Sequence, residues 1–304
     1  MIELYDKMDK SLNDYQFTIN YNDIDINNNK CIVDLNLDIT LTYQRGSDKE
    51  YTTNDTIKHY IILNKHKSDW SIIKDVYNPL EGPDRKAVSD DNYNNKLYSG
   101  LKEAYKSIDK KALSVKKWVK KSKKISENIQ SNEDIRIQYE PTPGAYRAIQ
   151  YARRYYENYN TKYPEFNNDC TNFVSQCLHA GNIPMSRPSW YCFNEDDYST
   201  SWIRTVELYD YLTDDKGFSS RSYDGYNVTE INDDTRPGDV IQFYNALKSR
   251  YAHTVIASKI DSEDGVLYCG HTSNRKDKPL IDAFDSTWYY TQLRLIEIEY
   301  PDGM

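Results

Sequence analysis

Hydrophobic residues recur with two different periods in the first 78 residues of the chain. Leu4, Met8 and Leu12 lie four residues apart, a spacing that predicts a short helix over residues 1–15. From about residue 16 to residue 78 the period changes to two, most clearly in the run from Leu35 to Leu41, and turn-like Asn and Asp stretches separate the apolar runs. This order predicts one helix followed by a curled antiparallel sheet.

A second helix is predicted between residues 93 and 130, where four apolar residues keep helical spacing: Leu97, Leu101, Tyr105 and Ile108. It runs into the lysine-rich sequence KKALSVKKWVKKSKKISENI. The lysines fit two interpretations. They form the solvated face of a connecting helix, or they bind an acidic surface or anionic lipid with Trp118 as an anchor. The apolar stripe is thin, which favours the connecting helix.

The second half of the chain begins with helical patterns and ends with strands. Helices are predicted from Ala145 onwards and from Cys170 to Gly181, and strands at residues 239–243, 252–260, 266–269 and 293–299. Helices first and antiparallel strands afterwards is an α+β order. The predicted division is an N-terminal α+β sheet domain over residues 1–90, a helical Lys-rich connector over 91–139 and a second domain over 140–304.

Composition and charge narrow the classes of partner and the compartment. The 304 residues carry a net charge of −8 and no large basic surface, so we expect no nucleic-acid partner. The N-terminus lacks the apolar stretch of a signal peptide, and nothing longer predicts a membrane span. The 5 cysteines form no CxxC pair, so the sequence suggests neither a zinc knuckle nor a redox dithiol. We therefore expect a cytoplasmic protein with reduced thiols, or a secreted one if a leader precedes this sequence.

Candidate chemistry centres on Cys170, the first residue of a predicted helix. Asn168 and Asp169 stand immediately before it and are good N-cap residues. A cysteine in the first helical turn meets free backbone N–H groups and the positive end of the helix dipole, which favour a thiolate and can stabilise an oxyanion. This placement suits acyl transfer, with Asn168 or Asp169 either aiding the oxyanion or capping the helix. The alternative is a buried structural cysteine.

Two histidines follow at predicted strand ends and fit the remaining roles of a catalytic triad. His253 stands near the start of an apolar strand, from which its ring could take the proton of Cys170. His271 ends the next strand and could orient the His253 ring. A structural or loop histidine is the alternative for each. A metal site of His253, His271 and Cys269 lacks a fourth ligand at the usual spacing, so we expect neither a metal nor a cofactor.

The sequence around Cys170 also carries a recognisable signature. It reads YPEFNNDCTNFVSQCL over residues 163–178, and is followed by Ala180-Gly181-x-Ile183-Pro184, Trp202, Gly238-Asp239-Val240-Ile241, His253-Thr254-Val255-Ile256 and His271-Thr272. Over about residues 144–300 these motifs resemble the putative amidase domain family of Gram-positive bacteria, which is similar to papain-like and NlpC/P60-like cysteine peptidases. The resemblance implies a papain-like fold, with Cys170 as nucleophile, His253 as base and His271 as the orienting residue.

Two further features have no catalytic constellation of their own. The segment ending in SDWSIIKDVYNP resembles the last strands of a cystatin-like or NTF2-like domain, which implies a structural or substrate-positioning module. Trp190 and Trp202 are candidates for lining a substrate cleft, and core packing is the alternative for each.

These expectations describe a cysteine-dependent amidase or peptidase that cleaves an amide or peptide, such as a cell-wall peptide, through a thioester acyl-enzyme. One alternative is a papain-like acyltransferase, which takes an acyl-thioester donor, for example on a carrier protein, and uses an amine in place of water. Another is a binding module with a catalytically dead papain-like fold.

Overall fold

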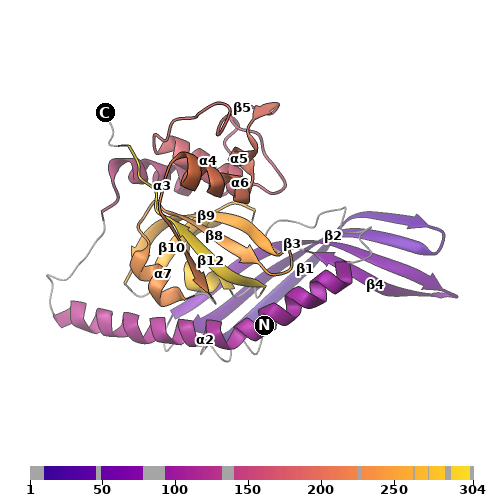
Figure 1. Ribbon diagram of the computed structural model, residues 1–304. Helices are drawn as coiled ribbons and strands as arrows, with labels where there is room; N and C mark the ends of the chain where they lie inside the picture. Colours follow the sequence, from indigo (N-terminus) through magenta and orange to yellow (C-terminus); the bar gives the residue numbers. More distant parts are fainter. Residues whose placement is uncertain are drawn as a thin grey trace.

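In the computed structural model the chain forms two antiparallel sheets and one long helix, with further helices on the second sheet (Figure 1). The structure describes residues 10–45, 49–77, 93–131, 140–224, 227–262, 264–272, 274–284 and 289–301. The first sheet has the strand order β1-β2-β3-β4. Its strands are β1 (Lys10–Asn27), β2 (Lys30–Arg45), β3 (Lys49–His66) and β4 (Asp69–Tyr77).

The second sheet has the order β11-β10-β9-β8-β12-β7. Its strands are β7 (Ser220–Asp224), β8 (Val240–Asn245), β9 (Arg250–Asp261), β10 (Gly265–Gly270), β11 (Arg275–Pro279) and β12 (Tyr290–Ile296). The longer helices are α2 (Tyr93–Ser131), α3 (Pro143–Tyr155) and α4 (Cys170–Ala180). Short elements are β5 (Cys192–Asn194), β6 (Asp197–Tyr198), α5 (Thr200–Ile203), α6 (Thr205–Asp210), the π-helix η2 (Tyr211–Asp215), α7 (Val228–Asp234) and the 3-10 helix η3 (Leu280–Phe284).

The strand β1 begins earlier than the change of hydrophobic period predicts. Residues 10–15 pair with the end of β2, and Tyr15 stands opposite Leu41. The helix expected over residues 1–15 is therefore wrong for this part, and residues 1–9 lie outside the described residues. The apolar residues at every second position from Tyr15 to Tyr21 extend the two-residue period, and this longer pattern favours the strand.

The long helix α2 confirms the helix predicted over residues 93–130 and packs against the second sheet. Its residues Ala104, Ala112, Val115 and Trp118 are buried in one hydrophobic cluster with residues of that sheet. Trp118 is only 4% exposed, so the interpretation as a lipid anchor is wrong. Within the described ranges, each helix is too short or too polar to cross a membrane.

The second sheet lies between two layers of helix (Figure 1). Helices α3 and α4 cover one face, and α2 covers the other. Because side chains alternate along a strand, the neighbours Val255 and Ile256 of β9 belong to opposite layers. Helices on antiparallel sheets confirm the predicted α+β class.

Tyr300 contacts three segments: the start of α3, the end of α4 and the residues just before β8. Its hydroxyl donates a 2.7 Å hydrogen bond to the carbonyl of Gly238, just before β8. The ring also packs against Gly144 of α3 and Gly181 at the end of α4, and a side chain at either of these glycines would collide with Tyr300. At Gly238 a side chain would meet Ala145 first, and the φ of +101° itself favours glycine.

Candidate active site

Helix α4 begins at Cys170, and Asp169 holds the N-cap position as predicted. The Asp169 side chain does not cap the helix, however. Its carboxylate accepts hydrogen bonds from the backbone N–H of Phe166 (3.1 Å), the amide of Asn172 (2.8 Å) and His271 Nδ1 (2.6 Å). The expected capping bond is therefore replaced by contacts that join the preceding loop, the first turn of α4 and the end of β10.

His271 is held by both of its ring nitrogens. Nδ1 donates to the Asp169 carboxylate and Nε2 to the carbonyl of Tyr155, each over 2.6 Å. Both acceptors are oxygens, an arrangement that an imidazolium satisfies with its two N–H groups. The ring stacks on Phe173, with centroids 3.8 Å apart. These bonds leave no ring nitrogen for His253, so the prediction that His271 orients His253 is wrong in this structure.

Cys170 lines a pocket of about 730 Å³ at the start of α4. The loop before α4 contributes Asn168, the segment 203–207 forms a second wall, and Arg250 and Ala252 of β9 form a third. The cysteine is only 3% exposed, and its Sγ lies 3.8 Å from the hydroxyl oxygen of Thr171. The thiol is thus almost fully buried, although its residue lines the pocket.

A buried polar network connects Thr171 to the strands of the second sheet. The Thr171 hydroxyl lies 3.1 Å from the hydroxyls of both Thr205 and Thr254. Gln242 donates from its amide to the Thr205 carbonyl (2.9 Å) and the Thr254 hydroxyl (3.3 Å). It also accepts a 2.7 Å bond from Arg294 Nε. We call these five residues the Thr-Gln-Arg network.

Arg294 brings a positive charge to the far end of this network. Its guanidinium lies between the rings of Tyr209 and Tyr251, 3.5 and 3.9 Å from their centroids. Burial lowers the pKa of Arg294 to about 10, so the side chain stays charged at neutral pH. Sequence reasoning missed this network, because its members span more than a hundred residues and form no motif. The local signals are Gln242, which interrupts the apolar run of β8 between Ile241 and Phe243, and Thr254, which directly precedes the apolar run from Val255 to Ala257.

His253 lies on the other face of the second sheet from Cys170. Its ring packs against Phe243 and Tyr290, with centroids 5.6 and 6.4 Å apart, and both neighbours belong to the layer that contains α2. The adjacent residue Thr254 faces α4 instead. Burial lowers the pKa of His253 to about 3, and Nδ1 has no hydrogen-bond partner among the described residues. The structure does not bring the two predicted reacting groups together.

A β-bulge next to His253 determines this orientation. Phe243 of β8 pairs with His253, but Tyr244 pairs with Tyr251, so Ala252 is left as an extra residue in β9. A bulge of this kind changes which side chains face each side of the sheet. Ala252 lies in the wall of the Cys170 pocket, so the bulge itself borders the candidate site.

The two tryptophans proposed for a substrate cleft are core residues. Trp190 and Trp202 are both 0% exposed, and their ring centroids lie 4.6 Å apart. Trp202 donates to the Asn172 amide oxygen (2.8 Å) and Trp190 to the Ser175 hydroxyl (3.1 Å), which fixes both rings against α4. Their expected role in the cleft is wrong, and the alternative of core packing holds. In the portion of the chain that the structure describes, no group of three or more His, Cys, Asp or Glu side chains could hold a metal ion.

Comparison with known proteins addresses the second half of the chain. A family model described as a putative amidase domain matches residues 144–295, half of the chain. Among curated proteins, the uncharacterized protein YhbB of Bacillus subtilis is 33% identical over 153 residues, which are 48% of this chain and 47% of YhbB. The uncharacterized protein YjcM of the same organism is 29% identical over 143 residues, 44% of this chain and 32% of YjcM. The matched region thus spans less than half the length of either relative. No solved structure matches the chain.

Proposed function

This chain belongs to the putative amidase domain family, and from that premise we propose that it is a cysteine-dependent amidase or peptidase with Cys170 as the nucleophile. The observation that carries the proposal is the position of Cys170, at the first residue of α4 and in the wall of a pocket of about 730 Å³. The first turn of a helix has N–H groups without intrahelical partners. Such groups favour a thiolate and can hold a developing oxyanion.

The Asp169–His271 pair supports this role of Cys170 through position. The Asp169 carboxylate stands directly before Cys170, and His271 Nδ1 donates to it over 2.6 Å, which directs that carboxylate toward the end of β10. We therefore assign His271 to the support of Asp169 and of the start of α4, in place of a direct contact with the base.

The proposed general base is His253, which must turn from one face of β9 to the other to reach Cys170. The bulge offers a route, because moving the extra position from Ala252 to His253 would turn the ring toward α4. Two observations favour this change: Ala252 already lines the pocket, and His253 Nδ1 is buried without a partner among the described residues. An unpartnered buried nitrogen costs about 1–3 kcal/mol, which weakens the preference for the present position.

In the proposed reaction His253 accepts the thiol proton and Cys170 Sγ attacks the carbonyl carbon of an amide or peptide. The C–N bond then breaks, and the protonated imidazole gives its proton to the leaving amine. Water, deprotonated by the same imidazole, attacks the thioester carbon, and the C–S bond breaks to release a carboxylic acid and the thiol. An amine in place of that water would form a new amide, which is the acyltransferase alternative.

The test is intact-mass analysis of wild type, Cys170→Ala and Cys192→Ala after incubation with phenyl thioacetate as an acyl donor. We expect one acetyl group on wild type and on Cys192→Ala, and none on Cys170→Ala. Cys192 is a matched control, because it is also buried but does not line the pocket. Loss of the acetyl group in buffer identifies hydrolysis, whereas its transfer to added glycinamide identifies an acyltransferase.

A rate measurement guards against nonspecific acylation. Iodoacetamide at pH 6 should alkylate Cys170 before the other four cysteines, as mapped by peptide mass. Equal labelling of all five cysteines, or an acetyl group that persists in Cys170→Ala, would contradict the proposal and favour a binding module.

A further inference from the structure

One side of the first sheet is lined by apolar side chains. Residues that pair across neighbouring strands point to the same side of a sheet, and each exposed apolar residue of β1 pairs with an odd-numbered residue of β2. Asn13 and Asn22 are extra residues in β-bulges, so the apolar side chains stay on one side although their spacing in the sequence changes there. Near the β1–β2 turn one apolar row crosses all four strands: Ile26, Cys31, Leu63 and Ile72.

Large side chains on this side of β1 and β4 are open to solvent. They are 37–65% exposed, and we call them the apolar face: Leu12, Tyr15, Phe17, Ile19, Tyr21, Ile24, Ile26, Trp70 and Ile72. A whole aromatic side chain offers about 150–250 Å², so the exposed fractions together amount to roughly 900 Å². The largest apolar patch on a typical monomer is only about 300–600 Å². The apolar face is therefore larger than a soluble monomer normally leaves in water.

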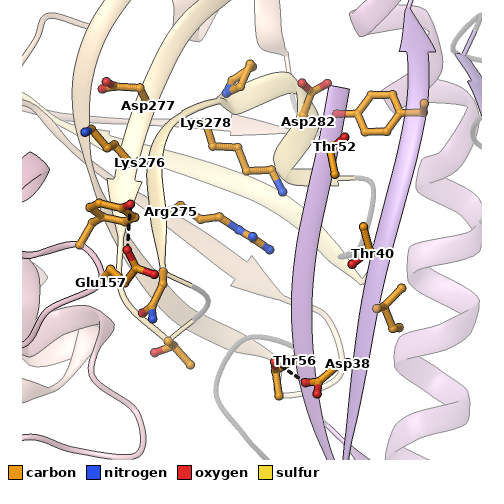
Figure 2. Close-up of a pocket in the computed structure, with 16 residues that line it drawn as sticks. Asp38, Thr40, Thr52, Thr56, Glu157, Arg275, Lys276, Asp277, Lys278 and Asp282 are labelled. Atoms are coloured by element: carbon orange, nitrogen blue, oxygen red, sulfur yellow. Dashed lines mark hydrogen bonds between the residues drawn. The ribbon is translucent and has the colours of Figure 1, made fainter. Parts of the chain in front are cut away.

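The opposite side of the same sheet is covered. Its apolar residues Tyr60, Ile62 and Val76 are 8%, 2% and 1% exposed. Polar residues on that side line a pocket of about 980 Å³ opposite β11 (Figure 2): Asp38, Thr40, Thr52 and Thr56. Ile39 and Tyr43 also border this pocket. The apolar side is thus shielded near Tyr43 and open along β1 and β4.

Charged residues are distributed unequally between the two sides. The aspartates of β1 lie on the side opposite to the apolar face: Asp14, Asp23 and Asp25. On the apolar side, His59 Nδ1 and an Asp75 oxygen contact each other at 2.9 Å. Lys65 stands at one end of this side, with its ammonium 5.8 Å from the centroid of the Trp70 ring. Two copies of the chain, each with a net charge of −8, can therefore meet through the apolar face without bringing the β1 aspartates together.

The free edge of β1 is protected against pairing with another strand. The backbone N–H of Tyr15 donates to the Asp14 carboxylate (2.8 Å), and that of Ile24 donates to the Asp23 carboxylate (2.9 Å). Both bonds lie next to the bulges of β1. Bulges and charged residues of this kind prevent a sheet from growing at its edge. Association through this sheet is therefore expected at its face.

We propose that the apolar face packs against the apolar face of a second copy of this chain. The result is a two-fold symmetric dimer, in which the two four-stranded sheets form a sandwich. Stable interfaces bury about 800 Å² on each partner, which the apolar face supplies. Two identical sheets have the same twist and can stack about 10 Å apart, and a two-fold axis lets one patch serve both partners. The dimer does not depend on Cys170 being the nucleophile.

Sedimentation velocity of the full chain over a range of concentrations tests this dimer. We expect wild type to reach a mass of about twice 35.8 kDa. Phe17→Lys places a charge at the centre of the apolar face on β1, and Ile72→Lys places one on β4. Each variant should raise the Kd of the dimer at least about thirtyfold, because a large apolar anchor is lost in both copies.

Thr18→Lys is the matched control, because Thr18 is the exposed neighbour of Phe17 on the other side of β1 and should leave the dimer unchanged. Far-UV circular dichroism checks that each variant is folded. A wild type that stays monomeric at every concentration, including one that floats with phosphatidylcholine vesicles, would overturn the proposal. So would a dimer that survives both Phe17→Lys and Ile72→Lys, or one that Thr18→Lys weakens equally.

Discussion

The two faces of the second sheet treat buried polar side chains in opposite ways. On the α4 face, Asp169 and His271 are joined by a 2.6 Å bond, and Gln242 and Arg294 by a 2.7 Å bond. On the α2 face, the imidazole of His253 lies among aromatic rings, and its Nδ1 lacks a hydrogen-bond partner among the described residues. Networks of hydrogen-bonded polar groups specify one arrangement, whereas an unpartnered group is held by packing alone. The polar side chains named on the α4 face are therefore held by hydrogen bonds, with Arg294 Nη2 as an exception, and His253 is held by the rings around it.

The largest effect should follow from breaking the Asp169–His271 pair. Asp169→Ala leaves His271 without its carboxylate and also removes the acceptor for Phe166 and Asn172. We expect the free energy of unfolding to fall by about 3–5 kcal/mol, as when one partner of a buried ion pair is removed. Urea unfolding measures this change, with Asp197→Ala, whose carboxylate is in an exposed ion pair, as the control. A loss below about 1 kcal/mol, the range of surface pairs, would show that the α4 face is no better organised than the α2 face.

A smaller, pH-dependent effect is expected at His253. Its pKa is lowered to about 3 in the folded chain, from an ordinary value of 6.5, so protonation favours the unfolded state. Stability from this group is present above pH 6.5 and is lost by about 1.4 kcal/mol per pH unit as the pH falls toward 3. His253→Leu removes this loss. The variant should therefore gain about 2 kcal/mol relative to wild type on going from pH 8 to pH 5, by urea unfolding at both pH values.

Histidine NMR sharpens the same comparison. If His253 remains on the α2 face, its ring carbon signals should stay those of neutral imidazole down to about pH 3. Titration near or above pH 6 in wild type, abolished in Cys170→Ala, would instead indicate that the ring has turned to the α4 face and pairs with the thiolate.

The smallest effect is expected at Arg294, which stands at the end of the Thr-Gln-Arg network opposite to Thr171. Arg294→Met removes the positive charge but keeps much of the volume between Tyr209 and Tyr251. The pH profile of Cys170 alkylation by iodoacetamide should move to higher pH by about half a unit, roughly threefold slower at pH 7. Arg204→Met, which removes an exposed charge at the rim of the pocket, is the control for general electrostatics. If the pH profile of alkylation moves equally in Arg294→Met and Arg204→Met, the charge of Arg294 does not act on Cys170 specifically through Gln242.

Local signals predicted the start of α4 well. Asn168 and Asp169 before a helical run place the helix boundary at Cys170, because N-cap preferences act within one turn. The same reasoning failed for the Asp169 side chain, since its partner His271 is 102 positions away in the sequence. A short polar side chain bonds whichever donor the tertiary fold brings to it, and that donor is invisible to local patterns.

The orientation of His253 could not be derived from the strand pattern. Alternation shows that His253 and Thr254 face opposite ways, but not which of them faces α4. That choice follows from the bulge at Ala252, which depends on how β8 and β9 pair. The interpretation of Trp118 as a lipid anchor was wrong for a related reason. A thin apolar stripe on α2 is enough to bury this side chain once the second sheet packs against the helix.

Tyr300 has a practical consequence for anyone who wishes to isolate the region that the family model matches. The family match ends at residue 295, yet the ring that fills the gap between Gly144, Gly181 and Gly238 lies five positions farther on. A fragment that ends at residue 295 would lose the Tyr300 ring and its hydrogen bond to the Gly238 carbonyl. A cavity would then remain between α3, α4 and the residues just before β8. Fragment boundaries should therefore be drawn from the packing of this tyrosine, beyond the edge of the alignment.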